Sequence, residues 1–507
     1  MSTNTIAPSK STFKDLYTRF KLIEYPFTVY TTENEKDKLV DLFIQTSVYA
    51  PIIESFNHGR TMMLIGNRGT GKTALLFDLL RKENKETTLV CSIDDFSELE
   101  TTGDLKEFYK LILKNLTSQI FLRLAKDQKR INKLNPEERL LLSYLLKNYL
   151  ENVTKRSLRD KIEQIQSPRL VRGLKKGYNY IRFTLNYGTT AAANIISDTI
   201  TSHFSKLPPV IQEGKVKDFF PELATEIDDG FLNLDSTYFL IERFIYIIKK
   251  MGFTKIIISL DKLDEDPRFE NDAEGISEFI KPVVTDNKLL LNQDIQLVVS
   301  VWAVPFSMLR DAVRTQKHYC PEITWNKTDL VMALNQRLKT YSNNKISNYK
   351  ELFDPKIEEN FLDEVFILAN SNPRDLWHVI NRIFEAQYEI DSDSSYISHE
   401  AIKEGFKHFV LKFNFYEYYP RKLNARANTM DIYSYVAHLQ KLPDEFFTKN
   451  QLNEYAKTGG STNNYVVAME KIGLVKKHEQ KSGTVVYKII DPKVTFAIKN
   501  GLRIEKN

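Results

Sequence analysis

The segment "GNRGTGKT" at residues 66–73 restricts the fold of this chain more than any other feature. It matches the phosphate-loop pattern G-x-x-x-x-G-K-[ST] at every fixed position. The apolar run "TMMLIG" before it has the composition of a buried strand, and "KTALLFDLLRKE" after it has helical periodicity. A strand, a glycine-rich turn and a helix in this order are typical of a parallel, helix-covered sheet. The segment therefore predicts an α/β fold with an anion-binding turn.

The residue types of this loop predict its chemistry. Glycines let the backbone wrap around a phosphate with the amide groups pointing inward, and the N-terminus of the next helix adds the positive end of its dipole. Lys72 is expected to reach the β- and γ-phosphates, and Thr73 to ligate Mg²⁺. The alternative is a glycine-rich turn that binds nothing, which the flanking strand and helix disfavour. We therefore expect ATP and Mg²⁺ as ligands. The expected nucleotide-binding residues are Gly66, Asn67, Arg68, Gly69, Thr70, Gly71, Lys72 and Thr73.

The segment "IIISLDKLDED", residues 256–266, is expected to complete the site. Asp261 ends an apolar strand that we expect beside the phosphate-loop strand, where its carboxylate would hold Mg²⁺ directly or through water; the alternative is a helix cap. The next residue is Lys262, which cannot orient an attacking water while protonated. Asp264 and Glu265 lie three and four residues beyond Asp261, and either could supply the missing carboxylate, with Glu265 favoured for its reach. The alternative, that both lie on a solvated turn, stays open.

The rest of the chain predicts several units. A length of 507 residues indicates about three domains. Further strands are expected at "TTLVCSIDD", "IQLVVSVWA" and, as a short piece, "EITW". The expected organisation is a parallel sheet covered by helices, with a large helical insertion, a helical lid and a C-terminal winged-helix domain. The expected units are 1–52 (N-terminal segment and helix), 53–104 with 235–326 (phosphate-loop core), 105–234 (insertion), 327–425 (lid and connector) and 426–507 (winged helix).

A basic block at 155–182 lies inside the insertion. It holds nine Lys or Arg residues against Asp160 and Glu163, with Tyr178 and Tyr180 among them. Cations interleaved with aromatic rings can bind single- or double-stranded nucleic acid, DNA or RNA. A solvated helical face explains the same composition equally well. The net charge of +5 is too small for this length to decide between them.

The C-terminal pattern is a short helix, a turn at Gly459-Gly460, a second helix at 461–471 and two strands joined at 481–483. On duplex DNA the second helix would enter the major groove and the lysines would contact phosphates. The helix contains no arginine, so a module that docks on protein is the alternative. The candidate DNA contacts are Asn463, Asn464, Lys476, Lys477 and Lys481.

Membrane insertion and export are not indicated. The chain has no run of about eighteen apolar residues and no apolar signal core near its start. Its two cysteines, Cys91 and Cys320, lack metal-ligand spacing. These features predict a cytoplasmic protein that does not contact a membrane.

The order of these segments resembles the AAA+ ATPases, in particular their origin-recognition-like bacterial and archaeal branch. The resemblance rests on "LIGNRGTGKTALL", "IIISLDKLDE", "IQLVVSVWA", "EITWNKTDLVMALNQRL", "NSNPRDLWHVINR" and the C-terminal winged helix. It implies a homo-oligomer in which Ser300 senses the γ-phosphate and Arg374 in "SNPRDL" touches the phosphates. It also implies a finger arginine, Arg310 or Arg314, acting on a neighbouring subunit. Lys262 and the insertion of more than a hundred residues depart from the family pattern.

Two functions fit these features. The first is an AAA+-like ATPase whose nucleotide state controls assembly or the engagement of nucleic acid or a partner protein. The second is a slow or non-hydrolysing nucleotide-gated adaptor that controls a separate effector, for example in bacterial defence against phage. Only Lys262, Asp264 and Glu265 separate the two in the sequence.

Overall fold

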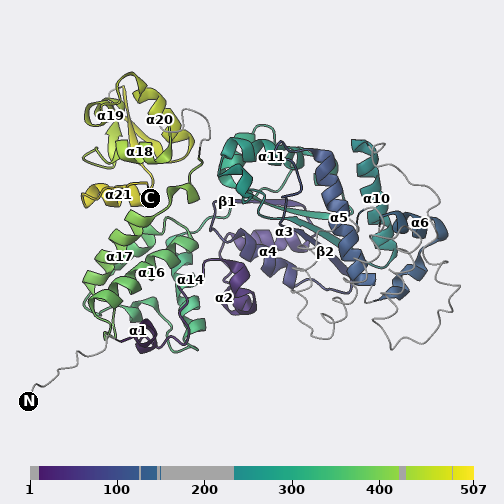
Figure 1. The fold of residues 1–507 in the computed structure, drawn as a ribbon, viewed down its shortest axis with the longest axis horizontal. Helices are drawn as coiled ribbons and strands as arrows, with labels where there is room; N and C mark the ends of the chain where they lie inside the picture. The colour runs from purple at the N-terminus through teal and green to yellow at the C-terminus, as the bar shows by residue number, and fades with distance from the viewer. Residues whose placement is uncertain are drawn as a thin grey trace, which may run out of the picture.

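The computed structural model describes residues 11–124, 127–145, 149, 233–421, 430–481 and 483–506. The basic block at 155–182 lies outside these residues, and so does the side chain of Lys481. Three parts follow one another along the chain: a parallel α/β sheet, a helical bundle and a small C-terminal unit (Figure 1).

The centre of the first part is a parallel sheet of four strands in the order β1-β4-β3-β2. The burial pattern is continuous or nearly so along β1, β3 and β4, as expected when helices cover both faces of a parallel sheet, whereas β2 at the edge exposes Ser92. The α/β class predicted from the sequence is therefore confirmed. The strands are β1 (Met62–Gly66), β2 (Thr88–Ile93), β3 (Lys255–Leu260) and β4 (Gln296–Trp302).

The predicted neighbour of the phosphate-loop strand was wrong. β3, which precedes Asp261, pairs with β2 and β4, and β4 separates it from β1. Apolar composition identifies strands, but helical crossovers allow a strand to skip a position in the sheet, so it does not set their order. The carboxyl ends of parallel strands still meet at one edge, and Asp261 therefore remains near the phosphate loop. The expected short strand at "EITW" is reduced to isolated parallel bridges, Met62 to Tyr319 and Ile65 to Glu322, on the other side of β1.

Alternate residues of β1 belong to different hydrophobic clusters, because side chains along a strand point to opposite faces. Met62 and Leu64 pack with α3 and α4, whereas Met63 and Ile65 pack with the other helix layer. Figure 1 shows α4 and α11 on opposite sides of the sheet. Helix α5, the first helix of the expected insertion, also packs directly against β2. The covering helices are α3 (Tyr49–Asn57), α4 (Lys72–Arg81), α5 (Leu105–Leu124), α10 (Leu234–Lys250), α11 (Ala273–Thr285) and α13 (Ala303–Leu309).

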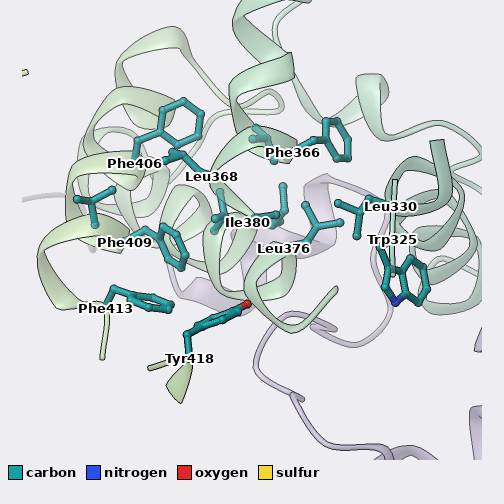
Figure 2. Packing of buried hydrophobic residues seen from close by; sticks show 14 of the residues in the cluster. Trp325, Leu330, Phe366, Leu368, Leu376, Ile380, Phe406, Phe409, Phe413 and Tyr418 are labelled. Atoms are coloured by element: carbon teal, nitrogen blue, oxygen red, sulfur yellow. The ribbon is translucent and has the colours of Figure 1, made fainter. Parts of the chain in front are cut away.

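The second part is a bundle of α14 (Lys327–Tyr341), α15 (Glu359–Leu368), α16 (Pro373–Ile390) and α17 (His399–Lys412). Helices α16 and α17 approach closely at Gly405, where a Cβ would lie 2.6 Å from the Cα of Ile383. Figure 2 shows the aromatic and aliphatic side chains of this core. The N-terminal α1 (Phe13–Arg19) packs on the bundle through Phe13 and Tyr388, whose ring centroids are 5.5 Å apart.

The C-terminal unit has an antiparallel sheet in the order β5-β7-β6, flanked by helices. Its last helix, α21, lies against α15 and α17 of the bundle. Its elements are α18 (Ile432–Leu439), β5 (Phe446–Thr448), α19 (Lys449–Ala456), α20 (Thr462–Lys471), β6 (Val475–Lys481), β7 (Thr484–Ile489) and α21 (Pro492–Lys499). The short elements elsewhere are η1 (Thr32–Lys38), α2 (Leu39–Leu42), η2 (Gln128–Lys133), α6 (Pro136–Leu145), η6 (Pro267–Phe269), α12 (Asn287–Leu290), η7 (Tyr349–Leu352) and η8 (Phe415–Glu417).

Within the described ranges, no helix combines the length and the apolar character needed to cross a lipid bilayer.

Candidate functional site

The turn between β1 and α4 has the backbone shape that its glycines allow. Gly69 and Gly71 have φ values of +80° and +86°, in the left-handed region that side chains disfavour. A Cβ on Gly66 would lie 2.7 Å from the Oγ1 of Thr70. Gly71 is the N-cap of α4 and has no side chain to accept hydrogen bonds from the first turn. The first amide groups of α4 are therefore open to an anion.

Lys72 points back over this turn. Its Nζ donates hydrogen bonds to the carbonyl oxygens of Gly66 and Asn67, at 2.9 and 3.0 Å. Burial lowers the pKa of Lys72, and nearby carboxylates, Asp264 most, work against this shift. The ammonium group is thus held inside the turn, where an entering phosphate would meet it.

Thr73 and Asp261 meet at the mouth of the loop. The Oγ1 of Thr73 donates a hydrogen bond to the Oδ2 of Asp261 at 2.8 Å. Burial raises the pKa of Asp261, and hydrogen bonding by Thr73 is the largest opposing effect. The buried hydroxyl of Ser300, on β4, also lowers the pKa of this carboxyl. The Thr73 hydroxyl of α4 and the Asp261 carboxylate at the end of β3 therefore meet at one point, with Ser300 of β4 near enough to affect the charge of Asp261.

Asp264 is buried in an ion pair with Arg68 of the phosphate loop. The Nε of Arg68 lies 2.8 Å from the Oδ2 of Asp264, and its Nη2 donates to the Asp264 carbonyl at 2.5 Å. The side chains are only 10% and 6% exposed. The same guanidinium lies 4.4 Å from the ring of Trp302 and hydrogen-bonds Asn271. The Asp264 carboxylate is therefore paired with Arg68 and does not lie on a solvated turn.

Glu265 faces the cavity instead. Within the described part of the chain its carboxylate forms no hydrogen bond or ion pair, although it lines the same cavity as Lys72 and Asp261. Burial raises the pKa of Glu265, and the charge of Asp264 raises it further, while Lys262 and Arg374 lower it. Of the two candidate carboxylates, Glu265 alone is available to hold a water molecule.

Lys262 lines the same cavity as Lys72 and Asp261 and is paired there with the N-terminal segment. Its backbone has a φ of +63°, and its Nζ lies 2.7 Å from the Oε1 of Glu33 in η1. Burial lowers the pKa of Lys262, but the hydrogen bond and charge of Glu33 outweigh this and raise it overall. Lys262 therefore anchors the N-terminal segment across the site.

The start of α16 forms the opposite wall. Asn372 caps this helix by accepting a hydrogen bond from the Arg374 amide at 2.9 Å, and its Nδ2 donates to the Arg68 carbonyl at 2.6 Å. A Cβ on Gly69 would lie 2.6 Å from the Oδ1 of Asn372. Arg374 lines the cavity, with its Nη1 4.0 Å from the Oε2 of Glu417. Asn372 thus acts as an N-cap, and Arg374 also faces the site.

Several adjoining cavities border these groups in the described part of the chain, among them one of about 570 Å³ lined by Arg68, Glu265 and Arg374. The phosphate loop, Asp261, Glu265 and Arg374 line a cavity of about 150 Å³. A second cavity of about 130 Å³ borders Gly71 and is largely aromatic and aliphatic. Sequence reasoning missed this second cavity, although the aromatic segment "EYPFTVY" and the tryptophan after "SNPRDL" were visible signals. Its apolar walls include Val29, Tyr30, Phe43, Ile44, Tyr49, Trp325 and Trp377.

The two candidate finger arginines lie elsewhere. Arg310 follows the end of α13 and Arg314 lies four residues later; both are exposed. Neither lines the cavity that holds Lys72 and Glu265. Within one copy of the chain they do not contribute to the site.

No protein-family model matches the sequence, and no curated protein matches it.

Asp264→Ala should destabilise the protein by about 3–5 kcal/mol, because the buried Arg68 would lose its charge partner. Glu359→Ala is the matched control, since it removes the exposed Lys350–Glu359 pair and should cost about 0–1 kcal/mol. Denaturant unfolding of both variants measures the difference. Equal losses would show that the Arg68–Asp264 pair does not hold the loop.

Proposed function

We propose that this protein binds Mg-ATP at the carboxyl edge of its parallel sheet. The observation that carries the proposal is the 2.8 Å contact between Thr73 and Asp261. This contact joins α4, which follows the glycine-rich turn, to the end of β3. In the sheet, β3 does not lie beside β1, the strand that leads into the turn. A hydroxyl, a carboxylate and a row of open amides beside one lysine suit a polyphosphate with its metal.

The residues fit the ligands that this proposal requires. Mg²⁺ prefers oxygen ligands and keeps several waters beside phosphate oxygens. Thr73 and Asp261 would supply the protein oxygens, and bound Mg²⁺ would neutralise phosphate charge. The aromatic cavity beside Gly71 suits a planar base, with Tyr30 and Trp377 among its walls.

Glu265 is the residue we assign to hydrolysis. A carboxylate near the γ-phosphate must orient or deprotonate water, and a raised pKa brings it closer to working pH. Glu265 lines the cavity with no partner among the described residues, whereas Asp264 is held by Arg68. Arg374 and Ser300 would then contact or sense the γ-phosphate from α16 and β4, in the roles that the AAA+ resemblance implies.

The sheet, the helical bundle and the C-terminal unit follow one another in the order expected for an AAA+ ATPase. In that arrangement the protein would form homo-oligomers, with Arg310 or Arg314 completing the site of a neighbouring copy. Nucleotide state would then control assembly or the engagement of nucleic acid or a partner protein.

A nucleotide-gated adaptor with little hydrolysis is the second candidate. The observation that favours this function is the Lys262–Glu33 ion pair, because it shows a paired cation at the position directly after Asp261. Such an adaptor would control a separate effector protein, for example in bacterial defence against phage.

The C-terminal unit supports a winged helix as the partner-binding module. Asn464 of α20 is exposed, and Asn463 accepts a hydrogen bond from Lys449 at 2.6 Å. Lys476 and Lys477 are exposed on β6. These side chains are available to duplex DNA, and the same exposed surface would suit an acidic protein.

Lys72→Ala should raise the Kd of Mg-ATP by about 10- to 100-fold, because it removes a charge-assisted contact to the phosphates. Lys85→Ala, an exposed lysine beyond the end of α4, should leave the Kd unchanged. Isothermal titration calorimetry with and without EDTA measures both. Absence of heat with the wild-type protein would overturn the proposal.

Glu265→Gln should abolish phosphate release while preserving Mg-ATP binding, because the amide cannot accept a proton from water. In the wild-type protein, acidification protonates the Glu265 carboxylate, which then no longer acts as a base. The rate should therefore fall with a midpoint above the ordinary glutamate value of 4.5, since the pKa of Glu265 is raised. Phosphate release measured across pH tests this. If Glu265→Gln matches wild type at a low basal rate, the adaptor function is the better description.

Lys476→Ala with Lys477→Ala should weaken binding to a mixed-sequence DNA duplex. The slope of log K against log salt should become shallower by about 0.9 for each lost phosphate contact. Lys345→Ala with Lys356→Ala, on exposed positions of the bundle, is the charge-matched control. Mobility shifts over a salt series, with and without Mg-ATP, measure the slope. An unchanged slope would assign this surface to a protein partner.

A further inference from the structure

A fully buried lysine lies between the helical bundle and the C-terminal unit. Lys493, in the first turn of α21, is 0% exposed. Its Nζ lies 3.5 Å from the Oδ1 of Asp491 and 3.6 Å from the Oδ2 of Asp375, and among the described residues it makes no hydrogen bond. It also lies 4.1 Å from the ring of Phe413 and 4.8 Å from that of Tyr418. A buried ammonium persists only when such charges and ring faces compensate for its lost hydration.

The cluster joins three segments of the chain. Asp375 belongs to α16, Phe413 and Tyr418 to the connector after α17, and Asp491 with Lys493 to the C-terminal unit. Figure 2 shows the Phe413 and Tyr418 rings close together, with the Tyr418 hydroxyl directed toward the α16 ribbon. Tyr419 continues the cluster by donating a hydrogen bond to the Oδ2 of Asp491 at 2.9 Å. The charged groups of this junction are buried, and Asp375, Phe413 and Tyr418 also line a cavity of about 570 Å³.

The same turn of α16 touches the phosphate loop on its other side. Asn372 donates to the Arg68 carbonyl at 2.6 Å, and Arg374 lines the cavity with Lys72. Asp375 follows Arg374 directly. One helical turn thus contacts the proposed phosphate site through two residues and the C-terminal unit through a third.

We propose that Lys493 is a positioning residue for the nucleotide site, acting through Asp375 on the first turn of α16. This inference rests on the proposed function. Separating Asp375 from Lys493 would leave charges buried and incompletely paired, so the turn and the C-terminal unit move as one body. Nucleotide binding at the loop would then reorient the C-terminal unit. By linkage, a partner bound to that unit would change the affinity for nucleotide by the same factor.

Burial supports this reading of the junction. It raises the pKa of Asp375 to about 6, and the charge of Lys493 is the main opposing effect. The lysine is therefore the group that keeps the Asp375 carboxyl charged beside Arg374.

Three variants test the proposal: Lys493→Met, Asp375→Asn and their double variant. The double variant removes the Asp375 charge together with Lys493 and should recover part of the stability lost in Lys493→Met, because only Asp491 then stays charged and it keeps its hydrogen bond from Tyr419. Lys499→Met, at the exposed end of the same helix, is the matched control. Circular dichroism and thermal unfolding establish which variants fold.

The first measurement needs no nucleotide. Hydrogen exchange should become faster at residues 66–73 and 372–376 in the folded Lys493, Asp375 and double variants, and should be unchanged in Lys499→Met. The second measurement is calorimetry with Mg-ATP, where the same variants should bind about tenfold more weakly. Mg-ATP should also change exchange at residues 449–471 in wild type and Lys499→Met only.

The outcomes separate the two proposals. Suppose that a folded variant lacking the Asp375–Lys493 pair exchanges its amide hydrogens at residues 66–73 at the wild-type rate. That result overturns the positioning role. A wild-type protein that binds no Mg-ATP overturns the proposed function, while the nucleotide-free exchange still decides whether Lys493 positions the loop. A double variant that recovers both stability and wild-type exchange would assign the cluster to folding alone and overturn the proposal.

Discussion

The buried ion pair between Arg68 and Asp264 connects the loop after β1 to the segment after β3 across the intervening strand. Both partners are nearly inaccessible to water, so neither can leave without exposing the other to an uncompensated low-dielectric environment. A second contact holds the loop from the other side, because the Arg68 carbonyl accepts a hydrogen bond from the Asn372 side-chain amide of α16. The ion pair also separates the roles of two adjacent acids: Asp264 stabilises the loop, and Glu265 is left facing the cavity.

The first turn of α16 is where the three parts of the molecule meet. Asn372 contacts the phosphate loop, Arg374 faces the cavity, and Asp375 is paired with Lys493 of the C-terminal unit. Consecutive residues of a helix point in different directions, which lets one short turn contact three surroundings. A small displacement of this turn would move the residues packed against it in both neighbouring parts, since packed interfaces deform little before they change to a second arrangement.

Sequence reasoning succeeds where the signal is local. The phosphate loop is contiguous, its glycines are required by backbone geometry, and its flanking strand and helix are short-range patterns; these predicted the α/β class and the residues of the loop.

It failed where the information is three-dimensional. The order of the strands depends on crossovers, so the strand β4 was predicted but its position between β1 and β3 was not. The pairings of Arg68 with Asp264 and of Lys262 with Glu33 join residues about two hundred positions apart, and composition cannot select such partners. The aromatic cavity combines the N-terminal segment with α16 for the same reason. The roles proposed for Arg310, Arg314 and the basic block depend on a second copy or on other molecules, which no single-chain pattern specifies.

The left-handed backbone of Lys262 and its contact with Glu33 bear on how such a site can evolve. A glutamate introduced at 262 would face the carboxylate of Glu33 across the distance now spanned by an ion pair, and attraction would become repulsion. It would also inherit a φ that residues other than glycine, asparagine and aspartate rarely adopt. A change to glutamate at position 262 would therefore need a second exchange at position 33, because Glu33 would otherwise lie beside a like charge.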